Sequence, residues 1–252
     1  MVRRYLAAAL MLAAATGLRA ETVDEVIAKH VQARGGLDKL KAVQTARFTG
    51  KMSVGPGMEA PVTLELKRPN SMRMEFVFQG MTGIQAFDGT NGWQIQPFGG
   101  KKDAEPLSPE DLKQAQEQAD IDGPLVDYKA KGHTVELVGK EKVEGSDAYK
   151  LKVNLKNGDV QYIFLDADSY LEIRDESKRM VRGSEVEEES TIGDYKEVNG
   201  VLFPFSMQFG AKGGTQKQNL TIDKVEVNPS VDSARFKMPA SAPAPAPVAS
   251  PK

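Results

Sequence analysis

Hydrophobic and polar residues follow two different periods along the chain. In "TVDEVIAKHVQARGG", apolar residues recur at helical spacing, acidic residues stand in the first turn, and a glycine pair ends the pattern. This predicts an amphipathic helix over residues 22–35, with a short second helix over residues 37–43. From Thr45 onward the period becomes two, which is typical of strands with one dry and one wet face.

The strand pattern continues to the end of the domain with one interruption. "LSPEDLKQAQEQAD" predicts an inserted helix over residues 108–120, with Ser108 as its N-cap and Pro109 at its first position. The joints between strands are short and rich in glycine, asparagine and aspartate, which favours antiparallel neighbours. We therefore expect a mainly β protein with two or three helices. A curved antiparallel sheet of about eleven strands would form an incomplete, half-open barrel with a helical lid or plug.

The stretch "AFDGTNGWQIQPF" carries Trp93, the only tryptophan of the chain, beside a tight run of turn residues. Asp-Gly and Asn-Gly favour hairpin turns, because glycine and asparagine accept positive φ and aspartate bonds its own backbone. A calcium loop would need oxygen ligands over about twelve residues and a closing glutamate, which are missing here. We interpret residues 88–92 as a hairpin turn.

Both ends of the chain differ from the part between them. Residues 1–20 combine two arginines, an apolar run and a final alanine, as an export signal does. Residues 239–252 form a Pro/Ala-rich tail that has too few apolar groups to pack. We expect one domain over residues 21–238, exported and monomeric, without a lipid anchor because the chain has no cysteine.

Charge and motifs exclude several functions. The net charge of −2 argues against nucleic acid as a partner. His30 and His133 are far apart and have no metal-ligand spacing around them, so no metal or other cofactor is expected. His30 fits a core position on the first helix, and His133 an exposed loop. Without a cysteine, a G-x-S-x-G motif or a Walker loop, we expect no enzyme.

Two features suggest binding. The acidic run Glu185–Ser190 is either a solvated strand face or a patch that meets a basic partner. Apolar residues on alternating positions of several strands would together form an apolar concave wall for a ligand, with methionine able to re-pack around chains of different length. The candidate wall residues are Met72, Met74, Phe76, Phe78, Trp93, Ile95, Leu151, Val153, Tyr162 and Phe164.

Four stretches give the chain a family resemblance: "GGLDKLKAVQTARFTG", "AFDGTNGWQI", "YIFLDADSYLEIR" and "DYKEVNGVLFPFSMQF". Over residues 22–236 the chain resembles the LolA-like outer-membrane lipoprotein-sorting proteins, a group that includes RseB-type sensors. The resemblance implies an open half-barrel closed by helices, whose apolar concave face takes up acyl chains.

The resemblance also implies a function and a mechanism. It suggests a soluble periplasmic carrier that takes acylated lipoprotein or lipid from a membrane-bound donor to an outer-membrane acceptor. An alternative on the same scaffold is a sensor or interaction module that binds a partner protein. In LolA-type carriers an arginine on an early strand helps to hold the lid shut, and Arg47 and Arg73 are the candidates for this role here.

Overall fold

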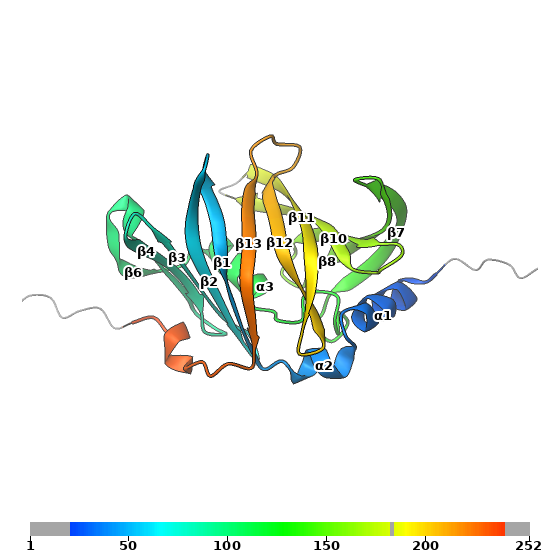
Figure 1. Ribbon diagram of the computed structural model, residues 1–252, viewed down its shortest axis with the longest axis horizontal. Helices are drawn as coiled ribbons and strands as arrows, with labels where there is room; N and C mark the ends of the chain where they lie inside the picture. Colours follow the sequence, from blue (N-terminus) through cyan, green and yellow to red (C-terminus); the bar gives the residue numbers. More distant parts are fainter. Residues whose placement is uncertain (1–20, 182–183, 240–252) are drawn as a thin grey trace, which may run out of the picture.

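The computed structural model describes residues 21–181 and 184–239, so the expected export signal and almost all of the expected tail lie outside the described residues. The described strands form one antiparallel sheet in the order β6-β5-β4-β3-β2-β1-β13-β12-β11-β10-β9-β8-β7. The sheet is curved and not closed. Figure 1 shows its two ends, β6 and β7, on opposite sides of the molecule, with α3 behind the middle of the sheet.

The helices are α1 (Val23–Ala33), α2 (Leu37–Ala42) and α3 (Pro109–Gln118), with two 3-10 turns, η1 (Pro97–Gly99) and η2 (Ser233–Phe236). The strands of the first half are β1 (Thr45–Gly55), β2 (Met58–Lys67), β3 (Ser71–Phe78), β4 (Met81–Phe87), β5 (Gly92–Gln96) and β6 (Lys101–Pro106). Those of the second half are β7 (Thr134–Val143), β8 (Ser146–Asn154), β9 (Val160–Asp166), β10 (Glu172–Val181), β11 (Ser184–Val198), β12 (Val201–Ala211) and β13 (Gln218–Val227).

The mainly β half-barrel with helices is confirmed, and it contains thirteen described strands where about eleven were expected. The alternating pattern misses β6, because "KKDAEP" has almost no apolar residues; the strand forms by pairing with β5. The hairpin at residues 88–92 is also confirmed. Asp88 Oδ1 accepts hydrogen bonds from the backbone N–H groups of Thr90 (2.9 Å) and Asn91 (2.7 Å).

The connection between the two halves of the sheet determines where a cavity can form. The chain leaves the sheet at β6, one edge, and returns at β7, the opposite edge. Residues 107–133, which we call the crossover segment and which include α3, therefore cross one face of the sheet. We call the face of the sheet that the crossover segment crosses the inner face, and the opposite face of the sheet the outer face.

The helices cover the inner face in two places. Thr22 and Glu25 form a capping box that starts α1, and Val26 and Ile27 bury against β7, β8 and β9. Burying each of these two side chains contributes about 1.5–3 kcal/mol. On the first half of the sheet, α3 buries Ala115 against a cluster that includes Met72. The part of the inner face between α1 and α3 is not filled by either helix.

Candidate functional site

An apolar cavity of about 370 Å³ lies on the inner face between α1 and the crossover segment. Strands from both halves of the sheet supply its wall, which includes Phe48, Leu64, Met74, Ile192, Phe203 and Ile222. Ile121 of the crossover segment covers it. Two larger hollows, of about 600 and 960 Å³, have more polar linings. The apolar cavity has a size and lining that suit a small ligand.

One end of the cavity is polar. It is lined by His30 of α1, by Arg34 at the C-cap of that helix, and by three further residues, Glu172 and Asp175 of β10 and Tyr195 of β11. The Tyr195 hydroxyl donates to the Glu172 backbone carbonyl (2.9 Å). Arg34 Nη1 donates to a backbone carbonyl of the crossover segment (3.0 Å). The cavity therefore has an apolar body and a polar end that carries two carboxyl groups.

A β-bulge brings these two carboxyl groups to the same face. Residues three apart on a regular strand point to opposite faces. Here the pairing with β9 shifts between Glu172 and Arg174, so that Glu172 lies opposite Leu165 and Asp175 opposite Ile163. Both of these β9 residues belong to the core under α1. The bulge therefore turns both carboxyl groups toward the inner face.

The surroundings shift the ionisation of the polar end. Burial, together with the nearby Asp175 charge, raises the pKa of Glu172, and burial likewise raises the pKa of Asp175. Burial and the Arg34 charge lower the pKa of His30 to about 4. His30 is thus neutral near pH 7 and its Nδ1 donates to the Tyr170 carbonyl (2.8 Å). This histidine is 3% exposed, as a core histidine should be.

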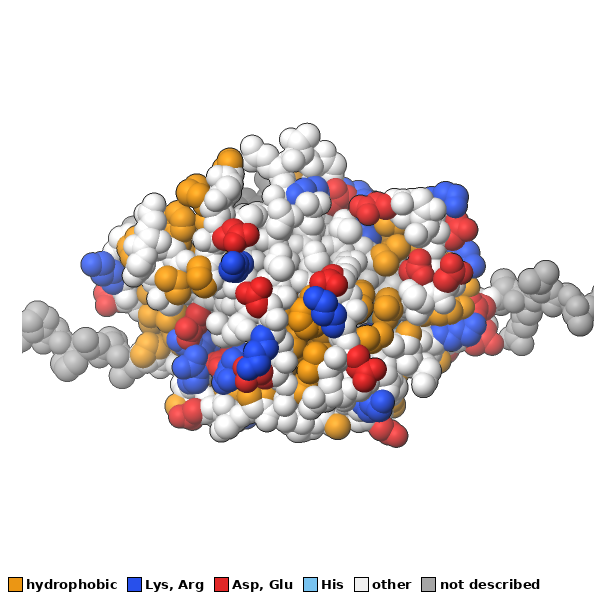
Figure 2. Space-filling view, viewed as in Figure 1, with side chains coloured by type: hydrophobic (Ala, Val, Ile, Leu, Met, Phe, Trp, Pro, Cys, Tyr) orange, Lys and Arg blue, Asp and Glu red, His pale blue; other side chains and the backbone are white. Residues whose placement is uncertain are grey.

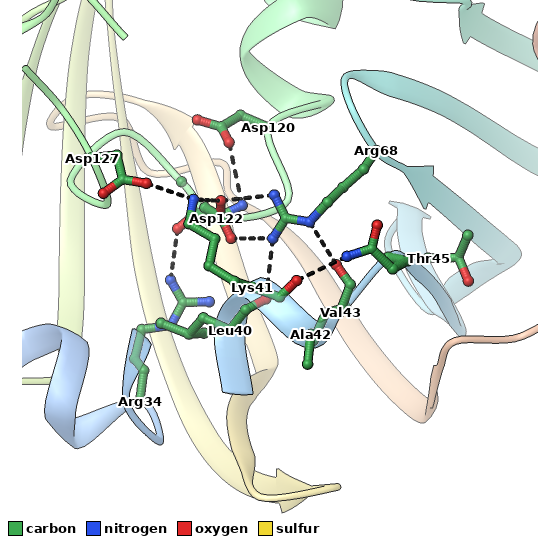
Figure 3. A network of polar contacts seen from close by, with 12 residues as sticks. Arg34, Leu40, Lys41, Ala42, Val43, Thr45, Arg68, Asp120, Asp122 and Asp127 are labelled. Carbon is green, nitrogen blue, oxygen red and sulfur yellow. Dashed lines mark hydrogen bonds and ion pairs between the residues drawn. The ribbon is translucent and has the colours of Figure 1, made fainter. Parts of the chain in front are cut away.

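An ion-pair network fixes the crossover segment over the cavity (Figure 3). Asp122, 2% exposed, binds Arg68 from the β2–β3 turn at 2.5 and 2.8 Å and Lys41 from α2 at 2.7 Å. Arg68 also donates to the carbonyls of Leu40 (3.1 Å) and Val43 (2.7 Å). Burial alone would raise the pKa of Asp122, but the hydrogen bonds from Arg68 and Lys41 lower it to about 2.

The structure brings only part of the expected wall to the inner face. Met74 lines the cavity, whereas Met72 on the same face is fully buried under α3. Phe76 and Phe78 continue this face but lie against Phe98, with ring centroids 5.1 and 6.1 Å apart, outside the cavity. Two further candidates on the inner face are covered by α1 instead of facing the cavity, namely Leu151 and Val153.

The other four candidates are on the outer face, so their expected place in the wall is corrected. Trp93 pairs with Ala86, one residue before the inner-face Phe87, and its indole Nε1 donates to the Phe236 carbonyl (2.8 Å). Ile95 lies two residues further on the same face. In the second half of the sheet, the outer-face candidates are Tyr162 and Phe164, which lie opposite Lys152 and Lys150.

Arg47 and Arg73 also lie on the outer face, away from the crossover segment. Arg47 binds Glu65 (2.9 Å) and Arg73 binds Glu75 (2.6 Å). Arg235 of η2 binds both glutamates, at 2.8 and 2.9 Å. Figure 2 shows basic and acidic side chains interspersed over the face that α3 does not cover. Among the described residues, the early arginines that contact the crossover segment are Arg34, which donates to a backbone carbonyl, and Arg68, which forms an ion pair with Asp122.

The acidic run is paired within the protein. Glu187 binds Lys178 (2.5 Å), Glu188 lies 3.7 Å from Arg179, and Glu189 binds Lys217 (2.5 Å). Strand β10 and the β12–β13 loop supply these cations, so the charges of the run are compensated within the protein. His133 is partly buried, and its Nδ1 accepts from the Lys156 backbone N–H (3.0 Å).

Sequence reasoning missed Arg68, Asp122, Glu172 and Asp175. Arg68 and Asp122 stand at turns, where no periodic pattern marks a charged residue as buried. The bulge that gathers Glu172 and Asp175 is a property of the pairing with β9. The one available signal was "DGP" at residues 122–124, an acidic residue in a break after the inserted helix.

Three solved structures match this architecture over nearly their whole length. A DUF1329 family protein from Desulfovibrio piger has a TM-score of 0.60 at 14% identity, with 86% of this chain and 98% of that one covered. A LolA superfamily protein from Nitrosomonas europaea has a TM-score of 0.57 at 11% identity, with 86% and 98% covered. A domain assigned to an outer membrane lipoprotein-sorting protein from Vibrio parahaemolyticus has a TM-score of 0.56 at 14% identity, with 83% and 94% covered. The chain has a LolA-like fold.

No family model matches the sequence, and no curated protein matches it significantly. At identities of 11–14%, the likeness to the LolA-like structures concerns the fold. In residues 21–181 and 184–239, no helix has the length and apolar character of a membrane span, and no group of side chains could hold a metal ion. The inner-face cavity is the feature of this chain that bears on its function.

Proposed function

We propose that the protein is an exported, monomeric carrier that binds an acyl chain of a lipid or lipoprotein in the inner-face cavity and delivers it toward the outer membrane. The observation that carries this proposal is the apolar wall that both halves of the sheet and the crossover segment build together. Each buried methylene contributes about 0.8 kcal/mol, so ten of them would contribute about 8 kcal/mol before the costs of ordering.

Binding by burial does not need the chemistry of an enzyme or a cofactor. Specificity for chain length would come from the adaptable Met74 and Met207 in the wall. Release would require the crossover segment to move, and the Arg68–Asp122 ion pair holds it in place. We assign to Arg68 the role of holding the lid that the family resemblance suggested for Arg47 or Arg73.

The alternative is a sensor that binds a partner protein through the acidic run. Lysines and an arginine from β10 and the β12–β13 loop already pair with this run. The carrier is therefore the function that the side chains favour.

Extraction of the natively purified protein into organic solvent, followed by mass spectrometry, tests the carrier. We expect near-stoichiometric acylated material from the wild type. Met74→Trp would fill the cavity and reduce this amount several-fold. Ile84→Trp is the matched control, because Ile84 lies on the next strand and, as the partner of Glu75 and Ile95, faces outward.

Two results would contradict the proposal. One is a stable wild-type protein that contains no acylated material. The other is a folded Met74→Trp variant that retains as much of it as the wild type does.

A further inference from the structure

The two carboxyl groups at the polar end of the cavity differ from the other acidic side chains near them. Asp120, also at the cavity, binds Lys131 (2.5 Å), and Asp122 binds Arg68 and Lys41. In the described part of the chain, no ion pair reaches Glu172 or Asp175. Glu176, which follows Asp175 but faces outward, has two cationic partners, Arg174 (2.8 Å) and Lys212 (2.7 Å).

The cations that face this end are few and already engaged. Arg34 is near Glu172, but its Nη1 donates to the Asp122 carbonyl. Arg179 acts on Asp175 from further along β10 and lies 3.7 Å from Glu188. His30 is neutral near pH 7 and uses its Nδ1 for the Tyr170 carbonyl. Each carboxyl group thus has one guanidinium near it, and each of these guanidinium groups already contacts another acceptor.

The remaining polar groups do not compensate for the missing charge. The Tyr195 hydroxyl is used by the Glu172 backbone carbonyl, and the Ser190 side chain hydrogen-bonds Asp175 without adding a positive charge. Burial raises the pKa of both carboxyl groups, which is the expected response of an acid that has lost water without forming an ion pair. A cation bound beside them would reverse this shift.

We propose that the ligand of this cavity is an amphiphile with a positively charged amine at the head of its alkyl chain, and that Glu172 and Asp175 bind this amine. The proposal rests on the proposed function, because it assigns the head of the same ligand. The apolar wall holds the chain, while the bulge of β10 places two acceptors where the chain ends. An ammonium group can donate to both carboxylates and supplies the missing positive charge.

The geometry also disfavours the opposite head. A fatty-acid carboxylate at this end would face two carboxyl groups, and the nearby guanidinium groups of Arg34 and Arg179 are already engaged. A neutral alcohol would gain the burial of its chain and a hydrogen bond but no charge compensation. Affinity should therefore fall in the order amine, alcohol, carboxylate.

Three probes with the same alkyl chain and different head groups separate the contribution of the head group to affinity from that of the chain. Decylamine, decan-1-ol and decanoate are titrated into the full-length protein at pH 7 by isothermal calorimetry, the two ionic probes below their critical micelle concentrations and the alcohol below its solubility limit. We expect decylamine to bind at least tenfold more tightly than decan-1-ol, and decanoate to bind more weakly than either.

Two variants test whether Glu172 and Asp175 cause the preference for decylamine. In Glu172→Gln/Asp175→Asn, decylamine should lose its advantage while decan-1-ol binds as in the wild type. Asp168→Asn is the control, since this exposed carboxyl group precedes β10 and does not line the cavity; it should keep the wild-type preference.

The outcomes distinguish the two proposals. If decan-1-ol binds but decylamine binds no more tightly, or decanoate binds most tightly, the amine head is wrong and the acyl-chain carrier stands. If the double variant keeps the preference for decylamine, the assignment to Glu172 and Asp175 is wrong. If none of the three probes binds, the carrier function itself is contradicted.

Discussion

The guanidinium of Arg68 meets the carboxylate of Asp122 with two parallel contacts, Nη1 to Oδ2 at 2.8 Å and Nη2 to Oδ1 at 2.5 Å. This pair joins the β2–β3 turn to the segment that covers the cavity. A two-contact arginine–carboxylate pair is directional as well as strong, and lysine cannot reproduce it. The pair therefore links the stability of the fold to the closure of the cavity.

Removing Arg68 should weaken the attachment of the crossover segment over the cavity. Arg68→Ala leaves the buried Asp122 with Lys41 alone, and we expect it to lower the free energy of unfolding by about 3 kcal/mol. A bound alkyl probe should also dissociate faster. Urea unfolding and stopped-flow displacement measure the two effects. Arg47→Ala, on the outer face, should leave the dissociation rate unchanged; equal acceleration in both variants would contradict the role of Arg68.

Acid should weaken the same contact. The pKa of Asp122 is about 2 in the folded protein and 3.8 in its ordinary state, so the unfolded chain binds the proton first as the pH falls. The stability that this carboxylate contributes is complete above about pH 4 and is lost as the pH falls toward 2. Urea unfolding between pH 6 and 2 should show a shallower loss for Asp122→Asn than for the wild type. Parallel curves would show that Asp122 is not a source of the acid sensitivity.

The ionisation of Glu172 should make the folded protein less stable as the pH rises, which is opposite to the effect of Asp122. Its pKa is raised in the folded protein above the ordinary 4.5, so the folded state keeps the proton longer and stability falls as the pH rises above that value. Without ligand, Glu172→Gln should therefore be more stable than the wild type at pH 8, by on the order of 1 kcal/mol, with the difference shrinking toward pH 4. Thermal unfolding across this range measures it, and a variant that is less stable at pH 8 would sink the prediction.

Trp93 tests which face of the sheet binds the ligand. Trp93→Phe removes the indole donor and leaves the Phe236 carbonyl without this hydrogen bond, which should cost about 1–2 kcal/mol of stability. Because Trp93 lies on the outer face, the affinity for decan-1-ol should not change. Weaker binding by a folded variant would place the ligand elsewhere than in the inner-face cavity.

Much of the fold could be predicted from the alternation within single strands, as the placement of Met74 on the inner face shows. Alternation does not say how the faces of two strands correspond, because that depends on their register. The turn at residues 88–92 pairs Phe87 with Gly92, which puts Trp93 on the face opposite to Phe87. The expectation that Tyr162 shares a face with Leu151 was wrong for the same reason. Leu151 lies opposite Ile163, so the preceding residue, Tyr162, points to the other face.

The polar part of the site was less predictable for two reasons. Glu172 and Asp175 share a face only because of a bulge, and a bulge leaves no regular trace in the hydrophobic pattern. Arg68 was less conspicuous than Arg47 and Arg73, which lie on strands. Its role depends on where the crossover segment passes, and this contact joins residues 54 positions apart.

The route of the crossover segment has a mechanical consequence. Its ends are attached to β6 and β7, the two edges of the same curved sheet, so it connects these edges across the concave side. A bulky ligand that pushes the crossover segment away from the sheet must draw the two edge strands, β6 and β7, closer together. In the proposed carrier, loading of the cavity and bending of the sheet would therefore be a single movement, whose size would report the size of the bound ligand.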